Sequence, residues 1–182
     1  MGESRQSLGD GQSWSVVRRL IDTDSADYLN LRREALEREP YAFGSSPGHD
    51  RFRAIEDVQQ ILADRQQAIF GAFDPDIVGA VGVRRLTRPK LHHKAELWGM
   101  YVRESHRRSG LGRRLLEGAI QFAREQDGVR QLHLTVTERA VAAAALYESL
   151  GFVVWGIEPA GLRIDGVDVT ELHMVLRFEN SA

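Results

Sequence analysis

The sequence contains no cysteine, which excludes disulfide bonds, thiolate metal ligands and a cysteine nucleophile. It has no apolar run near the roughly 20 residues that cross a bilayer, and the opening MGESRQSLGDGQS lacks the apolar core of a signal peptide. The net charge is only −2, so no overall field favours nucleic acid or an anionic membrane. These absences predict a cytoplasmic protein that binds neither nucleic acid nor a membrane.

What is present is the composition of an ordinary folded domain, with 42% apolar and 27% charged residues. The length of 182 residues fits one domain. No internal repeat or linker interrupts the chain after its first polar residues. We therefore predict a polar tail over residues 1–13 and a single domain over residues 14–182.

The spacing of apolar residues predicts the elements of that domain. Strands are expected over residues 14–20, 67–74, 76–86, 94–102 and 131–137, with two more inside 152–178, and helices over 25–39, 54–66, from 110 onward and over 140–150. The turn at Asp74-Pro75-Asp76 implies an antiparallel hairpin. A loop about Pro159 or a turn at Asp165-Gly166 joins the last two strands. The order predicts one mixed α/β domain.

A glycine pair opens the helix that is expected from residue 110. The first turn of a helix has unpaired backbone N–H groups and partial positive charge, and glycine lets an anion approach them closely. Arg107, Arg108, Arg113 and Arg114 add positive charge beside this turn. The pattern indicates a phosphate site; the alternative is a solvated basic helix end whose glycines only shape the turn.

The segment is neither a P-loop nor a complete dinucleotide fingerprint, because it lacks the Gly-Lys-Ser/Thr of the first and the third glycine of the second. Arg107-Arg108-Ser109-Gly110-Leu111-Gly112 instead resembles the R/Q-x-x-G-x-G/A loop of the GNAT family of N-acetyltransferases. AELWGMYVRESHRR resembles that family's fourth strand and its exit, and ALYESLGF (145–152) resembles its closing helix and the next strand. The likeness spans about residues 14 to 178.

The resemblance implies a GNAT fold, which is a single α/β domain with a mixed, mostly antiparallel sheet of about seven strands and about four helices. The sheet would splay between strands 4 and 5, and Gly99 marks a bulge that would help to open this gap. The resemblance also implies acetyl-CoA as co-substrate, no metal, and direct transfer of an acetyl group to a primary amine of a small molecule or peptide. The implied cofactor-binding residues are Met100, Tyr101, Val102, Arg107, Arg108, Ser109, Gly110, Leu111, Gly112 and Arg113.

Acetyl transfer needs a proton donor for the departing thiolate and a base for the ammonium group. Tyr147 matches the family tyrosine that commonly lies near the sulfur, although packing alone would also explain it. Glu96 at the start of the fourth strand is the base candidate; the alternative is an exposed glutamate paired with Lys94 or an arginine. His92 or His93 could replace it. Ala140 stands where many members have an asparagine, so any contact made by that side chain is lost.

The resemblance places the acceptor between the connection of the first helices and the last two strands. Candidate substrate-binding residues are Tyr41, Phe43, Ser45 and Arg163, whose guanidinium could hold a carboxylate, although the aromatic residues could equally be local packing. The residues leave the identity of the amine open. They also leave open a homodimer and, as the alternative function, a non-catalytic sensor that binds acetyl-CoA on the same fold.

Overall fold

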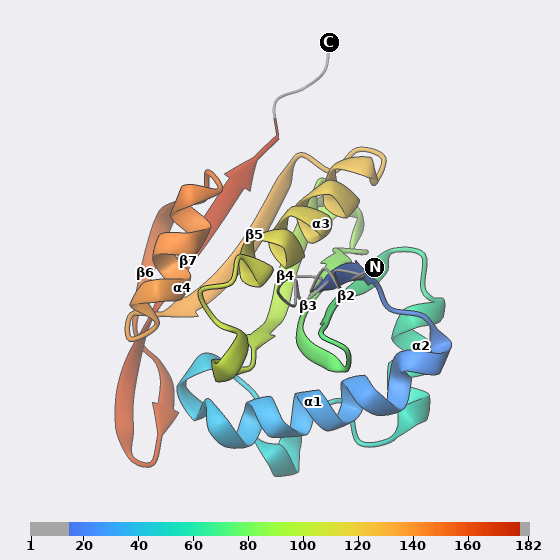
Figure 1. Ribbon diagram of the computed structural model, residues 1–182. Helices are drawn as coiled ribbons and strands as arrows, with labels where there is room; N and C mark the ends of the chain where they lie inside the picture. The colour runs from blue at the N-terminus through green and yellow to red at the C-terminus, as the bar shows by residue number, and fades with distance from the viewer. Residues whose placement is uncertain (1–14, 179–182) are drawn as a thin grey trace, which may run out of the picture.

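A computed structural model describes residues 15–178 of the chain (Figure 1). The tail predicted over residues 1–13 lies outside the described residues. One sheet contains the strands β1 (Val16–Arg19), β2 (Gln67–Phe73), β3 (Ile77–Arg85), β4 (Lys94–Val102), β5 (Gln131–Thr137), β6 (Val153–Ile164) and β7 (Val167–Arg177). The α-helices of the described part are α1 (Ser25–Arg38), α2 (Ile55–Ala63), α3 (Leu111–Glu125) and α4 (Val141–Ser149). None of them is long and apolar enough to cross a bilayer.

The order of elements agrees with the prediction, and β4 and β5 have the predicted bounds. Of the two predicted connections between the last two strands, the structure has the turn at Asp165-Gly166. Asp165 and Gly166 form the turn, with φ of 50° and 80°, while Pro159 lies inside β6. The register between β6 and β7 shifts between Glu158 and Leu162, so this proline stands at an irregularity where a missing N–H is tolerated.

The sheet order is β1-β2-β3-β4-β5-β7-β6, and only the β4–β5 pair is parallel among the described strands. That pairing joins Lys94, Ala95 and Glu96 to the first three residues of β5 and then stops. From Leu97 onward β4 pairs only with β3. The predicted splay between strands 4 and 5 is therefore confirmed.

Gly99 lies at a β-bulge in β4, as predicted. Its φ is +64°, and the register with β3 shifts between Ala80 and Gly82. The extra residue changes which side chains face each side of the sheet. Ala95 packs into the core beneath α3 before the bulge, whereas Met100 does so after it, one residue out of alternation.

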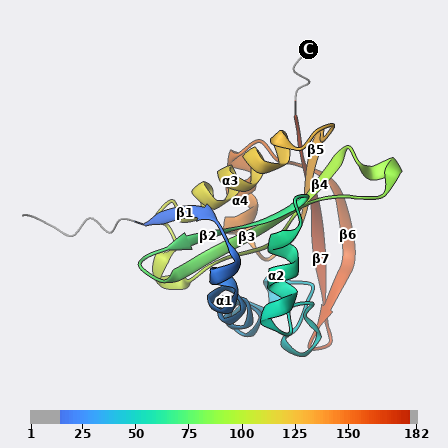
Figure 2. The same cartoon turned by 90° about the vertical axis from the view of Figure 1, so that its right-hand side faces the viewer.

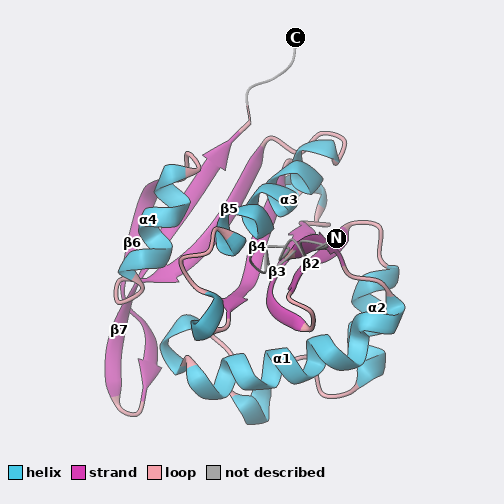
Figure 3. Ribbon diagram, in the orientation of Figure 1, coloured by secondary structure: helices cyan, strands magenta, loops and turns pink. Residues whose placement is uncertain are grey.

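Helices cover both faces of the sheet, with α3 and α4 on one side and α1 and α2 on the other (Figures 2 and 3). On the α3–α4 side of the sheet, the core contains the apolar stripe predicted for α3, which comprises Leu111, Leu115, Leu116, Ala119, Ile120 and Ala123. On the α1–α2 side of the sheet, a second core contains the buried face of α1, including Tyr28, Leu29 and Leu36. The splay lies between β4 and β5, beyond Glu96 and His133.

Candidate active site

The loop before α3 presents backbone donors without a capping side chain. Gly110 is the N-cap at φ +83°, and no side chain of residues 15–178 caps it. A Cβ built on Gly110 meets nothing within 4 Å, so its surroundings are open. Arg108 also has positive φ, 61°. Left-handed residues next to a helix start turn successive N–H groups into a concavity that suits a phosphate. The loop thus has a backbone geometry that suits an anion, which is the kind of site that the sequence predicted.

Arg107 does not point its side chain toward this concavity. Its Nε donates to the carbonyl oxygen of Val102 at 3.0 Å, and its Nη2 forms an ion pair with Glu39 just after α1. The side chain therefore ties the loop back to β4 and α1. Any contribution of Arg107 to a phosphate would come from its main chain.

Two of the other loop arginines also hold neighbouring elements. Arg113 donates to Ser149 Oγ at the end of α4 (2.6 Å), and Arg114 donates to the carbonyl oxygen of Ser15 (3.0 Å). Arg108 is exposed and has no hydrogen-bond or ion-pair partner within residues 15–178. Of these side chains, Arg108 is the one available to an anion.

Ser109 and Gly112 shape the same loop. Ser109 Oγ donates to the carbonyl oxygen of His106 at 2.6 Å. A Cβ on Gly112 would lie 3.2 Å from Leu146 Cδ2 and 3.3 Å from Met100 Cε. Glycine at this position therefore lets α3 begin close to both α4 and β4, which is a packing role in addition to the predicted binding role.

Tyr101 faces away from this loop, toward α1. Its hydroxyl donates to Glu34 Oε1 at 3.0 Å, and burial together with this carboxylate raises the pKa of Tyr101 to about 12. Its side chain lies in the core beneath α1. Its predicted cofactor contact would therefore be made by the backbone.

Tyr147 on α4 is a buried tyrosine whose hydroxyl lies at the edge of the core. The residue is 7% exposed, and its ring packs edge-on against Phe152 with centroids 5.9 Å apart. Its hydroxyl makes no hydrogen bond within residues 15–178, yet it is not one of the fully enclosed polar atoms of that region. Burial raises the pKa of Tyr147 to about 12, so the hydroxyl keeps its proton at neutral pH.

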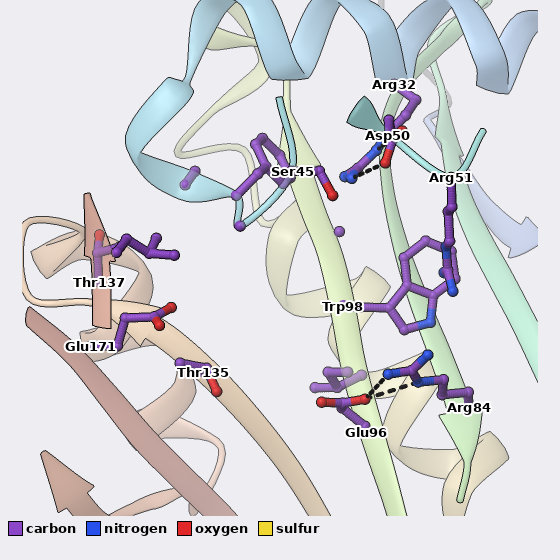
Figure 4. Close-up of a pocket in the computed structure, with 16 residues that line it drawn as sticks. Arg32, Ser45, Asp50, Arg51, Arg84, Glu96, Trp98, Thr135, Thr137 and Glu171 are labelled. Carbon is purple, nitrogen blue, oxygen red and sulfur yellow. Dashed lines mark hydrogen bonds and ion pairs between the residues drawn. The ribbon is translucent and has the colours of Figure 1, made fainter. Parts of the chain in front are cut away.

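A pocket of about 320 Å³ opens at the splay (Figure 4). One wall comes from α1 and the loop after it, the floor from β4, and the opposite wall from β5, β6 and β7. Its polar and aromatic lining includes Arg32, Phe43, Ser45, Asp50, Arg51, Arg84, Glu96, Trp98, Thr135, Thr137 and Glu171.

Glu96 lies in this pocket and is paired with an arginine, as one of the two predicted alternatives states. Arg84 Nε on the neighbouring strand donates to Glu96 Oε2 at 2.8 Å, and Arg84 Nη2 contacts the same oxygen. Figure 4 shows the pair at one end of the pocket. Oε1 of Glu96 has no partner within residues 15–178, so the pairing leaves one oxygen for a ligand.

Glu171 on β7 is a second pocket carboxylate that sequence reasoning did not single out. It has no hydrogen-bond or ion-pair partner among the described residues. Burial, and then the negative charge of Glu158 opposite it on β6, raise the pKa of Glu171, while His173 lowers it. A Cβ on Gly161 would come within 2.8 Å of Glu171 Oε2, so the irregular part of β6 provides the space for this carboxylate.

Arg32 and Asp50 form a buried ion pair that was also not predicted. Arg32 Nε and Nη2 donate to the two Asp50 oxygens at 2.9 and 3.0 Å. Burial favours the neutral acid, but the hydrogen bonds and charge of Arg32 outweigh it, so the pKa of Asp50 is lowered; Ser45 contributes to this. The available signal was an arginine between Leu29 and Leu36, on the apolar face of α1.

Only some of the predicted substrate residues lie in the pocket. Phe43 and Ser45 line the pocket. Tyr41 lies beside it but not in its lining, where its carbonyl oxygen accepts a hydrogen bond from Thr137 Oγ1 at 3.0 Å and its ring contacts the guanidinium of Arg139. These contacts fasten the loop after α1 to the end of β5, next to Ala140.

Arg163 and the two histidines lie outside the pocket lining. Arg163 pairs with Asp168 at 2.6 Å in the exposed β6–β7 hairpin. His92 contacts the carbonyl oxygen of Thr87 in the loop before β4, and His93 follows it in the same loop. The structure thus brings Phe43, Ser45 and Glu96 together and leaves these three apart.

The sequence profile described as the Acetyltransferase (GNAT) family matches residues 28–152. Mycothiol acetyltransferase of Salinispora tropica is 35% identical over 156 residues, which cover 81% of this chain and 47% of the relative. A GNAT-family acetyltransferase from Streptococcus pneumoniae has a similar solved structure, with a TM-score of 0.80, 25% identity, and coverage of 90% of this chain and 99% of that one.

The structure of yncA from Salmonella typhimurium, solved with acetyl-CoA, also has a TM-score of 0.80, at 21% identity over 92% of this chain and 96% of that one. The matched regions span between a third and about half of the length of the first curated relatives. The profile match covers more than half of the chain and includes the loop before α3, β5 and α4. The chain therefore belongs to the GNAT acetyltransferase family.

Proposed function

We propose that this chain transfers an acetyl group from acetyl-CoA directly to a primary amine of a small molecule or peptide. The observation that carries the proposal is the course of β4. This strand leaves β5 at Glu96, passes along the pocket, and leads into the uncapped loop at residues 108–110. One strand thus connects a phosphate-binding loop to an acceptor pocket.

Acetyl-CoA, when bound, supplies the acetyl group as a thioester that an unprotonated amine attacks. The main chain around Arg108 to Arg113 would hold the diphosphate, and the exposed Arg108 side chain would add positive charge. The unpaired edge of β4 after Glu96 would offer backbone groups to the pantetheine amides.

The pocket must also take a proton from the acceptor. An alkyl ammonium with a pKa near 10 is only about 0.1% neutral at pH 7, so a base can recover roughly 4 kcal/mol. Glu96 stays our proposed base, acting through Oε1. Glu171 is the second candidate because it has no ion-pair partner among residues 15–178, and its raised pKa favours acceptance of a proton. Tyr147 would donate a proton to the departing thiolate.

The variant Glu171→Gln tests whether Glu171 or Glu96 is the base. If Glu171 is the base, activity is lost as pH falls through its raised pKa, because the carboxylate must be unprotonated to accept a proton. The variant should lower kcat by about 100-fold and remove that acidic limb from the pH profile. The matched Glu96→Gln variant should then keep the limb. The reverse result would assign the base to Glu96.

Acetyl-CoA at 100 times its Kd should stabilise the fold by about 2.7 kcal/mol and raise Tm by about 5–11 °C. Release of free thiol across a panel of amines, including peptides with free N-termini, then tests turnover. A Tm increase with no thiol release from any amine would favour the sensor alternative. An unchanged Tm would contradict cofactor binding itself.

A further inference from the structure

The pocket lining contains a buried cationic donor that no described residue satisfies. Arg32 is 8% exposed, and its Nε and Nη2 are used by Asp50. Its Nη1 is fully enclosed and has no hydrogen-bond partner within residues 15–178. Buried polar atoms of folded proteins nearly always have partners, so an orphaned guanidinium N–H indicates a missing acceptor.

This donor lies beside Gly99, which is another residue of the pocket lining. A Cβ built on Gly99 lies 3.4 Å from Arg32 Nη1, and both residues line the pocket. Figure 4 shows the Arg32 guanidinium reaching from α1 toward β4. Gly99 places no side chain over the donor. Because Nη1 is enclosed, a ligand carboxylate lying along β4 would contact it only after a local shift of Arg32 or Gly99.

Arg51 adds a second positive charge to the pocket lining. Its guanidinium lies over the ring of Trp98, 4.0 Å from the centroid, and has no carboxylate partner in the described part of the chain. Desolvation lowers the pKa of Arg51, and the positive charges of Arg84 and Arg32 add to this, while Tyr28 and Asp50 act in the opposite direction. A bound anion would reduce the repulsion between Arg51 and these two arginines.

The opposite wall has the opposite charge. Glu171 projects from β7 with no ion-pair partner among residues 15–178, and Figure 4 places it across β4 from Arg32 and Arg51. An ammonium group suits that wall, near the splay where β4 leaves β5. The two ends of the pocket therefore complement a molecule with an amine at one end and an anion at the other.

We propose that the acceptor is an amino acid, whose free carboxylate is bound by Arg32 Nη1 and Arg51 while its amino group faces Glu171 and the splay. A carboxylate oxygen is the acceptor that the orphaned donor lacks, and hydrogen bonds between charged groups are the strong ones. This assignment rests on the proposed acetyl transfer and names its substrate class.

The test compares each of the 20 common L-amino acids with its carboxamide as acceptor, measured as free-thiol release. The carboxamide keeps the amine and side chain but loses the negative charge. For the preferred side chain, the acid should exceed the amide in kcat/KM by about tenfold or more, mainly through KM. Equal use of acids and amides would overturn the carboxylate assignment while leaving the proposed transferase activity supported.

Two variants test which residues cause the preference for the acid over the amide. Arg32→Lys keeps a cation for Asp50 but removes the second arm of the guanidinium, and Arg51→Gln removes a charge that has no ion-pair partner to disrupt. Each should bring the ratio of kcat/KM for acid over amide toward one. Arg33→Lys is the control, since Arg33 is exposed on α1 and donates to the carbonyl oxygen of Arg53 outside the pocket. A ratio that stays at the wild-type value in both pocket variants would overturn the assignment.

If no acceptor is acetylated, the proposed function is refuted. Calorimetry then tests the carboxylate site independently of turnover. N-acetyl amino acids and their amides are then titrated into the protein. Tighter binding of the acids, lost in Arg51→Gln, would support the carboxylate site independently of turnover. Equal binding of acids and amides, or no binding of either, would overturn it.

Discussion

Tyr147→Phe is expected to lower kcat by about 100-fold and to leave the affinity for acetyl-CoA unchanged, because the ring still packs against Phe152 while the proton donor is lost. Stopped assays of thiol release give kcat, and titration with acetyl-CoA gives the affinity. The effect should be in the chemical step, since the phenol is protonated at neutral pH and its loss removes the proposed donor to the thiolate.

Tyr28→Phe is the matched control for this variant. Tyr28 is also a buried tyrosine, but it lies in the core on the α1 side of the sheet and its hydroxyl has no partner within residues 15–178. Its removal should leave kcat at the wild-type value. If Tyr147→Phe also keeps the wild-type kcat, Tyr147 has no part in proton transfer.

Gly110→Val is expected to weaken acetyl-CoA binding by at least about tenfold, because a β-branched residue resists the left-handed conformation that aims the loop N–H groups. The built Cβ meets nothing within 4 Å, so the expected loss comes from the backbone and not from a clash inside the protein. Calorimetric titration with coenzyme A measures it.

Gly166→Val separates this loss from a loss of stability. Gly166 has φ of +80°, close to that of Gly110, and its Cβ position is equally open, but it lies in the β6–β7 turn. Both variants should lower the free energy of unfolding by about 1–3 kcal/mol. Only the Gly110 variant should bind coenzyme A more weakly; an equal affinity in the two variants would remove the loop from the cofactor site.

The sequence predicted the elements well because the signals for them are local. The apolar stripe of α3, the alternation in β5 and the glycine at the start of α3 each depend on residues close together in the chain. The bulge at Gly99 was also predictable, since a glycine inside a good strand needs a local reason. The exact ends of α2 were not, because its last predicted turn has no strong stop signal.

The pairing of side chains could not be predicted in the same way. Glu96 could have been paired with Lys94 or an arginine, and only the register of β3 against β4 selects Arg84. Arg107 was predicted beside a phosphate, yet Glu39 and Val102 hold its side chain elsewhere. Long flexible side chains choose among several partners, and the choice depends on which elements the fold brings near.

By itself, the sequence determined that this chain has a glycine-led helix after a bulged strand, because backbone conformation and apolar periodicity are encoded by neighbouring residues. Tertiary structure alone decided that Arg32 of α1 and Glu171 of β7 line one pocket. Those residues lie near opposite ends of the chain. Their meeting depends on the early end of the β4–β5 pairing and on the packing of the β6–β7 hairpin, which are properties of the folded whole.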